Sequence, residues 1–453
     1  MKHICGRLSI KGVCSVLLLA CLLMVGTGCQ KLFLDQDALL KNQPVTFSLK
    51  VNETLPPAAP PAMIPVTPRP TGTISPPATA LDSRLVPRKE TVVAGTPSQG
   101  PVTLREQRES RTMLTRAESV LAGRTISEDL TLRGTVLVRG SLVVAPQATL
   151  RLEAGTQVRF ASAAGSGAKP SLVVLGRLMA QGTAQKPVVL GAAFEQPAVG
   201  DWGGVVLIST EKKNSLDHCR IEGAQTGITA RYSQFSGAGL AIMQSHVGIA
   251  LYDSVVSLTK TEIQRCDVGL TLSDSEMELK DSLVKENRLG LVALRSALVV
   301  GGLKLRNNSQ EGMVLDQARF RISGSAVTEN RSGVRATGGE GQILFSRFAM
   351  NREDGVALQE TRIRISDSSF IRNGRAGLAL ENARGSAVGS TFADNAQAQL
   401  LHAGDEPFSA LLNWWGAADE QRIVSGIQDS GRISGQGKVQ YVPFLVQSPA
   451  NVP

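Results

Sequence analysis

Two aspartates have the type and spacing that acid–base chemistry requires. Asp253 and Asp274 each stand five residues after a glycine and lie 21 residues apart. If residues one repeat apart stack on adjacent turns of the chain, about 4.8 Å apart, the two carboxylates are close enough to act as a catalytic acid–base pair. The alternative is a solvated turn, where Asp is common. We favour the turn, because the same place in the next three repeats holds Arg295, Gln317 and Gly338.

Tryptophans that can stack on sugar rings are the second kind of candidate. Trp202, in the segment Gly-Asp-Trp-Gly-Gly, and Trp414 are the candidate ligand-binding residues. Structural roles are the alternative and the one we favour, because single apolar side chains at the surface need no function. We expect Trp415 to lie inside the protein and Trp414 outside.

The positions of the histidines and cysteines do not indicate a metal site or a catalytic nucleophile. The histidines His218, His246 and His402 fall at different points of the repeat, and no His/Cys/Asp cluster has metal-ligand spacing. Cys219 and Cys266 are the two cysteines beyond the signal region. Their repeat positions predict buried, unbridged thiols. We expect no metal, no cofactor and no recognised catalytic residue.

An internal repeat must position these side chains. A glycine followed by an apolar residue recurs at intervals of 21 or 22 residues, at Gly227, Gly248, Gly269, Gly290, Gly312, Gly333, Gly355 and Gly377. Apolar residues recur at the same period in three columns, one of which is Ile221, Ile242, Ile263, Val284, Leu305, Val327, Phe348, Phe370 and Phe392. Period-two alternation inside each short segment predicts strands with one inward face. Units this small must stack on one another as a solenoid.

The kind of solenoid follows from what the repeat lacks. It has no Leu-x-x-Leu-x-Leu signature and no helical periodicity, so the sequence predicts an all-β fold, a right-handed parallel β-helix. An asparagine column supports this prediction, since stacked amides can hydrogen-bond along the axis and Asn tolerates left-handed corners. Its members are Asn287, Asn308, Asn330, Asn351, Asn373 and Asn395, with Cys266 one repeat ahead.

The N-terminal region predicts export and a tether. Lys2, Arg7 and Lys11 precede an apolar run and then Gly26-Thr27-Gly28, the order of a secretory signal. Small residues before Cys29 resemble a bacterial lipobox, which implies acylation of Cys29. In that family, a residue such as Gln30 rather than Asp after the cysteine implies anchoring to the outer membrane. Thirteen of the 21 prolines lie between residues 44 and 101, which predicts a flexible tether.

We therefore predict five segments. They are a signal peptide (1–28), a Pro-rich tether (29–103), a possible capping helix (104–124), a β-helix (125–447) and a short tail (448–453). Of the net charge of +9, residues 1–29 hold +3 and residues 30–124 hold +4, which leaves +2 for the remainder. A nearly neutral body is a poor match for nucleic acid, so we expect no nucleic-acid partner.

A family resemblance follows from the first and last parts of the body. Residues 134–160, 172–190 and 200–204 resemble the opening coils of pectin-lyase-like β-helix proteins, and Asn413-Trp414-Trp415-Gly416 is similar to the close of bacterial envelope members. The resemblance implies the fold, but it says little about activity. Polygalacturonase-type members carry Asn-Thr-Asp, Asp-Asp and Gly-His-Gly signatures, which this chain lacks.

Three functions remain open at this point. The one we favour is a lipid-anchored, non-catalytic scaffold or binding module for polysaccharide or an envelope protein. The others are a polysaccharide-active lyase, hydrolase or epimerase with an unrecognised carboxylate site, and a structural, adhesin-like stalk. A groove lined by carboxylates with a basic residue favours an enzyme, whereas a surface without any groove favours a stalk.

Overall fold

The computed structural model describes residues 112–113, 117–162, 167–209, 212–429 and 437–450, together with two short strands, β1 (Leu32–Leu34) and β2 (Phe47–Leu49). These two strands pair antiparallel in a sheet of their own. The predicted signal peptide and Cys29 lie outside the described residues, as does the predicted tether apart from β1 and β2.

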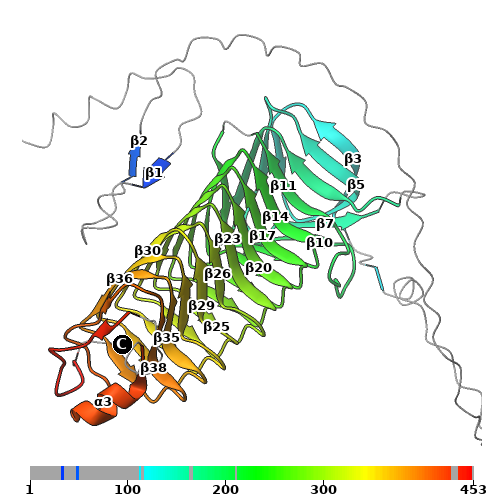
Figure 1. Ribbon diagram of the computed structural model, residues 1–453. Coiled ribbons are helices and arrows are strands. Elements are labelled where there is room, and N and C mark those ends of the chain that lie inside the picture. Colours follow the sequence, from blue (N-terminus) through cyan, green and yellow to red (C-terminus); the bar gives the residue numbers. More distant parts are fainter. Residues whose placement is uncertain are drawn as a thin grey trace, which may run out of the picture. The chain divides into compact units, whose positions relative to one another are not determined.

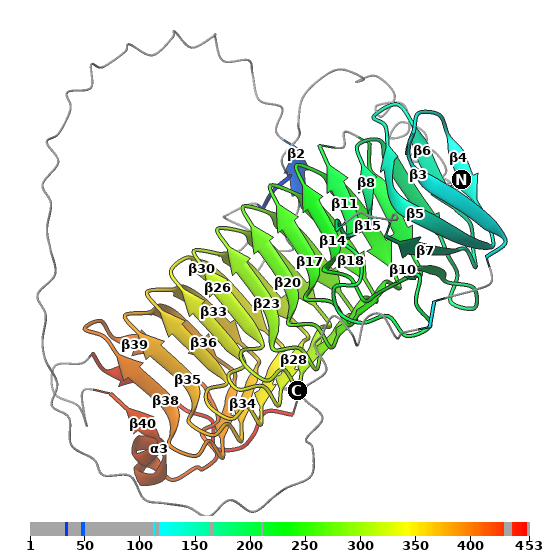
Figure 2. The same cartoon turned by 90° about the vertical axis from the view of Figure 1, so that its right-hand side faces the viewer.

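The body is a parallel β-helix in which each coil contributes one strand to each of three faces (Figures 1 and 2). Two long strands at its N-terminal end, β3 (Ser119–Ile126) and β5 (Thr135–Val144), span faces 1 and 2. Every strand pair in the body is parallel, and the sheet ladders give each strand between the end coils hydrogen-bonded neighbours on both sides. The predicted fold class is confirmed.

Face 1 is the ladder of short strands β7 (Gln157–Ala161), β10 (Val188–Ala192), β13 (Cys219–Glu222), β16 (Ala241–Met243), β19 (Glu262–Gln264), β22 (Leu283–Lys285), β25 (Lys304–Arg306), β28 (Ala326–Thr328), β31 (Arg347–Ala349), β34 (Ser369–Ile371) and β37 (Thr391–Ala393).

Face 2 consists of β8 (Ser171–Val174), β11 (Gly204–Ile208), β14 (Thr226–Arg231), β17 (Val247–Tyr252), β20 (Val268–Ser273), β23 (Leu289–Leu294), β26 (Met313–Asp316), β29 (Val334–Thr337), β32 (Val356–Gln359), β35 (Ala376–Glu381), β38 (Ala398–Ala403) and β40 (Ile427–Gln428).

Face 3 consists of β4 (Leu130–Leu132), β6 (Thr149–Leu152), β9 (Arg177–Gln181), β12 (Asn214–Asp217), β15 (Gln234–Ala238), β18 (Val255–Thr259), β21 (Glu276–Lys280), β24 (Ala297–Gly301), β27 (Arg319–Ser323), β30 (Glu340–Leu344), β33 (Arg362–Ser366), β36 (Arg384–Val388), β39 (Phe408–Ser409) and β41 (Val439–Gln440).

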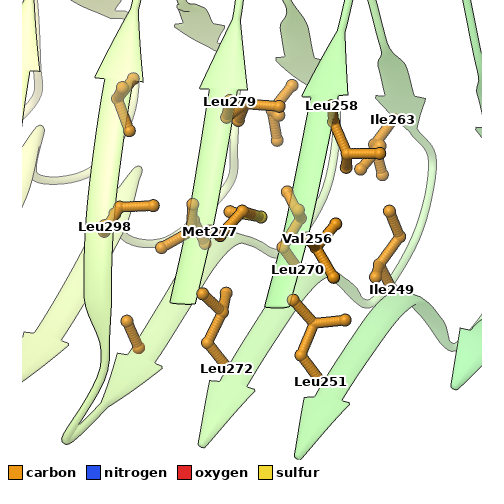
Figure 3. Packing of buried hydrophobic residues seen from close by; sticks show 14 of the residues in the cluster. Ile249, Leu251, Val256, Leu258, Ile263, Leu270, Leu272, Met277, Leu279 and Leu298 are labelled. Atoms are coloured by element: carbon orange, nitrogen blue, oxygen red, sulfur yellow. The ribbon is translucent and has the colours of Figure 1, made fainter. Parts of the chain in front are cut away.

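The predicted apolar columns form the core. Residues one repeat apart are register partners, as in Ile249 with Leu270 and Leu251 with Leu272, and their side chains point into the space between the faces (Figure 3). Val256, Leu258 and Met277 of face 3 meet them from the other side. Burying one such side chain contributes roughly 1.5–3 kcal/mol, so stacked layers of small aliphatic residues stabilise the body although large rings are few.

The recurring glycines allow close approach of stacked backbones. Gly248 and Gly290 are the second residues of β17 and β23. A Cβ at Gly248 would lie 2.4 Å from the carbonyl oxygen of Gly269, and one at Gly290 would lie 2.3 Å from that of Gly312. None of the eight glycines has a positive φ. Glycine is therefore required at this position because the coils are too close for a Cβ atom, and not because the backbone is left-handed.

The asparagine column is a continuous hydrogen-bonded ladder. The Nδ2 group of Asn330 donates to Oδ1 of Asn351 at 3.2 Å, and Asn351 donates to Asn373 at 3.0 Å in the same way. The expectation of axial amide bonds is confirmed. The expectation that these asparagines adopt left-handed backbone is wrong, because the positive φ falls one residue earlier, as at Glu329 and Arg372.

Both ends of the body differ from the prediction. The described end of the predicted capping helix, from Ser119, belongs to β3, which pairs with β5 and starts the β-helix earlier than residue 125. Backbone pairing with the next coil outweighs the helical pattern there. An unpredicted helix, α3 (Glu420–Gly426), is capped by Asp419, whose side chain accepts a hydrogen bond from the Arg422 amide at 2.9 Å, and it buries Ile423.

Candidate functional site

The aspartate pair lies at the corner between faces 2 and 3. Asp253 and Asp274 follow β17 and β20 directly, and both have left-handed backbone, with φ of 46° and 50°. Arg295, the next residue of this column, donates to both carboxylate oxygens of Asp274 at 2.8 and 2.7 Å. This hydrogen bonding raises the pKa of Arg295. The carboxylate of Asp274 is thus neutralised by an ion pair, as expected of a solvated turn.

A groove continues along the same corner towards the C-terminal end. We call it the arginine groove; it has a volume of about 770 Å³ and begins at Arg295, next to the aspartates. Its lining holds four arginines and two glutamates, which gives a net charge of +2. The lining residues are Arg295, Ser296, Ala297, Gln317, Ala318, Arg319, Gly339, Glu340, Glu360, Thr361, Arg362, Asn382 and Arg384.

One wall of the arginine groove is a column of register partners on face 3. Arg319, Glu340, Arg362 and Arg384 are the first residues of β27, β30, β33 and β36 and follow one another in register. Arg319 pairs with Glu340 at 3.1 Å, and Arg384 pairs with Glu406 at 2.8 Å. Among the described residues, Arg362 has no ion-pair partner, so its guanidinium is available to a ligand.

Small residues form the floor. Ser296, Ala318, Gly339 and Thr361 occupy one position of successive coils, and the side chains of Ser296, Ala318 and Thr361 are buried, so little side-chain volume projects into the groove here. The hydroxyl of Ser296 donates to the Leu294 carbonyl at 2.7 Å, and that of Thr361 donates to the Gln359 carbonyl at 2.8 Å. Both hydroxyl hydrogens are therefore bonded to backbone carbonyls, and hydrogen bonds to a ligand must come from side chains of the walls.

A second basic column runs beside the wall. Arg321, Gln342 and Arg364 are register partners two residues further along the same strands. Arg321 donates to the Gln342 side chain at 3.0 Å, and burial lowers the pKa of the Arg321 guanidinium. Face 3 is thus basic over β27 to β36, whereas Glu276 and Glu278 make it acidic at β21.

The two candidate tryptophans lie away from the groove. Trp202 is fully buried, its ring stacks on Phe160 at 4.9 Å and its indole nitrogen donates to the Glu222 carbonyl at 2.9 Å. It cannot offer a platform to a sugar, because none of its surface is exposed. Trp414 is half-buried and forms a bridge with Thr391 at the end of face 1.

The remaining reactive residues are inert or separated. Cys219 and Cys266 are buried, unbridged thiols, and burial raises the pKa of Cys266 to about 11. His402 is buried in the column that continues Leu380, with Nε2 2.7 Å from the Glu406 carbonyl oxygen. In the part of the chain that the structure describes, no three His, Cys, Asp or Glu residues form a metal-binding group.

Sequence reasoning missed the arginine wall, although a signal was present. Arg-x-Arg occurs at 319–321 and again at 362–364, at the same place in the repeat. The columns of acidic residues alone do not reveal this wall, because its arginines stand two positions after the column of Asp253, Asp274 and Arg295. The depth of the groove could not be foreseen, because it depends on floor residues such as Ala318 and Thr361 turning inward at the corner.

Comparison with protein-family models identifies the class. Residues 124–233 match the pectate-lyase-like β-helix domain, and residues 269–409 match the right-handed β-helix region. The chain is a right-handed, pectin-lyase-like β-helix repeat protein, as the first and last coils indicate. Comparison with curated protein sequences finds no match.

Solved structures with a similar fold include three polysaccharide-active enzymes. A periplasmic alginate epimerase shares 13% identity over 70% of this chain and 83% of its own, with a TM-score of 0.42. The A-module of a mannuronan C-5 epimerase of Azotobacter vinelandii shares 16% identity over 74% of this chain and 90% of its own, with a TM-score of 0.31. A pectate lyase shares 13% identity over 67% and 71%, with a TM-score of 0.29.

No helix among the described residues is long and apolar enough to cross a bilayer.

Proposed function

We propose that this protein binds an acidic polysaccharide along the arginine groove and does not cleave it. The observation that carries the proposal is the wall of Arg319, Arg362 and Arg384, in which Arg362 lacks an ion-pair partner among the described residues. A guanidinium binds a carboxylate or sulfate through two parallel hydrogen bonds, which a neutral sugar cannot offer.

The direction of the groove suits a polymer. The wall follows the axis of the β-helix, and the four register steps from Ala297 to Arg384 span about 19 Å at an inter-strand spacing of about 4.8 Å. A chain of several sugars laid along the axis meets one basic or polar side chain at each coil. A compact ligand would leave most of these contacts unused.

The composition of the groove favours binding over catalysis. Its lining contains no histidine, lysine, tyrosine or cysteine, the floor hydroxyls are bonded to backbone, and Glu340 is paired with Arg319. The observation in favour of an enzyme is Glu360, a carboxylate in the groove without an ion-pair partner among the described residues. One glutamate without a second acid or base is a poor catalytic set.

The proposed location is the cell envelope, with acylated Cys29 as the outer-membrane anchor. The apolar run and small residues before Cys29 support this part of the proposal.

Binding and turnover are measured together to test the proposal. Affinity electrophoresis of the protein in gels containing polygalacturonate, alginate or a neutral glucan should show retardation by the acidic polymers alone, and the retardation should weaken as salt is added. The mass of each polymer is measured after incubation. Retardation without shortened or unsaturated product supports the proposal, product makes the protein an enzyme, and no retardation by any polymer favours a stalk.

A further inference from the structure

We propose that a recess on face 2 receives a neutral sugar side branch of the polysaccharide that lies in the arginine groove. This inference rests on the proposed function and adds a feature of the ligand. The recess, here called the alanine recess, has a volume of about 220 Å³ and spans β29, β32, β35 and β38. Its floor holds Ala357 and Ala379, and Leu401 closes one end.

A change of residue size along one outward column produces the recess. Val292, Val314, Arg335, Ala357, Ala379 and Leu401 are successive register partners on the outer side of face 2. Two alanines between an arginine and a leucine leave a depression two coils long. At about 220 Å³ it is smaller than the 300–1,000 Å³ of sites for drug-sized ligands. It suits one sugar ring rather than a chain.

The lining of the alanine recess indicates a ring with one less polar face and no charge. The alanine methyls offer apolar contact, and Thr337, Gln359 and Glu381 offer hydrogen bonds at the rim. Carboxylates already pair with both arginines beside the recess, since Nε of Arg375 lies 2.8 Å from Asp354 and Arg335 lies 3.5 Å from Glu311. A second carboxylate would find no unpaired cation here. A neutral sugar can make both the apolar contacts with the floor and the hydrogen bonds with the rim.

The alanine recess and the arginine groove are adjacent across a single corner. Gln359 lines the recess and Glu360 lines the groove; likewise Glu381 lines the recess and Asn382 lines the groove. Thr337 lines the recess and Gly339 lines the groove. Because these residues are two positions apart in the chain, their Cα atoms are at most about 7 Å apart. A single glycosidic linkage to a backbone sugar can bridge that distance.

One position of the corner offers a passage. Between Arg295 and Asn382, Gly338 is the one corner residue without a side chain, and it has a φ of +62°. The Gln317 carboxamide lies over it, in the space that a Cβ at Gly338 would occupy. This side chain is exposed and makes no hydrogen bond within the described residues, so it can turn aside and bond to the branch.

The experiment compares one polymer with and without its branches. The probes are a pectic polysaccharide with neutral galactan branches and the same preparation after glycosidase removal of the branches. The full chain should bind the branched form about tenfold more tightly, which corresponds to 1.4 kcal/mol. Isothermal titration calorimetry gives both constants.

Two variants locate the difference. Ala357→Gln fills the alanine recess, and Gly338→Asn fills the corner without backbone strain, since Asn382 already adopts a φ of 51° at the same corner. Each should lower affinity for the branched polymer to that for the debranched polymer, and Ala357→Gln, whose site lies outside the lining of the arginine groove, should leave debranched binding unchanged. Val292→Gln, in the same outward column three coils away, is the matched control and should change neither constant.

The outcomes separate this inference from the proposed function. Equal binding of the two polymers by the wild-type protein overturns the side-branch inference and leaves the proposed function standing. The same holds if the two variants keep the full preference for branches. Failure of both polymers to bind overturns the proposed function, and the inference with it. Thermal melts of each variant show that it is folded.

Discussion

The indole ring of Trp415 stacks on the phenyl ring of Phe392, with centroids 4.9 Å apart and planes inclined by 20°. Phe392 stacks in turn on Phe370 at 4.8 Å, and Phe370 stacks on Phe348 at 5.2 Å. The last coils therefore share one aromatic column, and the expected inward position of Trp415 is confirmed.

A charge in this column should collapse the C-terminal coils. Phe370 is fully buried, so Phe370→Asp places a carboxylate between two aromatic rings without a partner. Phenylalanine-to-alanine changes in cores cost about 3–5 kcal/mol, and the buried charge adds to that loss. The free energy of unfolding from urea denaturation measures the effect. Phe345→Asp is the control because Phe345 is 53% exposed. If Phe370→Asp loses no more unfolding free energy than Phe345→Asp, the inward position of Phe370 is contradicted.

Removal of one amide should interrupt the asparagine ladder. Asn330 accepts bonds from the backbone and side chain of Asn308, at 3.1 and 2.9 Å, and donates to Asn351. Asn330→Ala leaves buried polar groups unpaired on both sides, at a cost of about 2–3 kcal/mol. The exposed Asn307 serves as control, and Asn307→Ala should cost under about 1 kcal/mol. Equal losses of unfolding free energy in the two variants would show that the ladder adds no stability.

A methyl group at one of the recurring glycines should force two coils apart. Gly290→Ala brings Cβ to 2.3 Å from the Gly312 carbonyl oxygen, whereas Gly301→Ala meets no atom closer than 3.8 Å. We expect a loss of more than about 2 kcal/mol at residue 290 and a change within about 0.5 kcal/mol at residue 301. Guanidinium denaturation followed by circular dichroism checks both, and a wild-type midpoint for Gly290→Ala would disprove the packing explanation.

The arginine wall should carry affinity for acidic polymers. Arg362→Ala removes the wall arginine without an ion-pair partner, and we expect affinity for polygalacturonate to fall about tenfold with a shallower dependence on salt. The matched control is Arg372→Ala, an exposed arginine of another corner, 3.9 Å from Asp394. Affinity electrophoresis at several salt concentrations compares them. Equal retardation of the two variants would place the binding site elsewhere.

The predicted anchor is tested by fractionation. Cys29→Ser removes the sulfur that lipid attachment needs, so the protein should move from the membrane fraction to the soluble fraction. Immunoblots of the separated fractions, with an unrelated lipoprotein as marker, follow the change. Unchanged membrane association would refute acylation of Cys29 as the main anchor.

The sequence predicts the coils well, because a strictly periodic pattern has one way to stack. Ile249 and Leu270, or Asn330 and Asn351, become partners as soon as the repeat length is known. The ends of the body were harder to predict, because β3 and α3 occur once and have no periodic counterpart. The binding surface was the least predictable part. Trp202 lies before the first of the regular repeats, so the periodic pattern does not predict that its ring stacks on Phe160. The arginine groove depends on side-chain volume at an outer corner.

The uniform spacing of register partners also bears on how the chain reaches its native state. From β13 to β38, register partners on successive coils are only 21 or 22 positions apart, as from Ile249 to Leu270 or from Leu291 to Met313. Each coil can therefore dock on its predecessor soon after it is made, with a small and constant loop-closure cost. Folding can start at any of these coils and extend to its neighbours, and a substitution such as Gly290→Ala should slow that extension at the coil it affects.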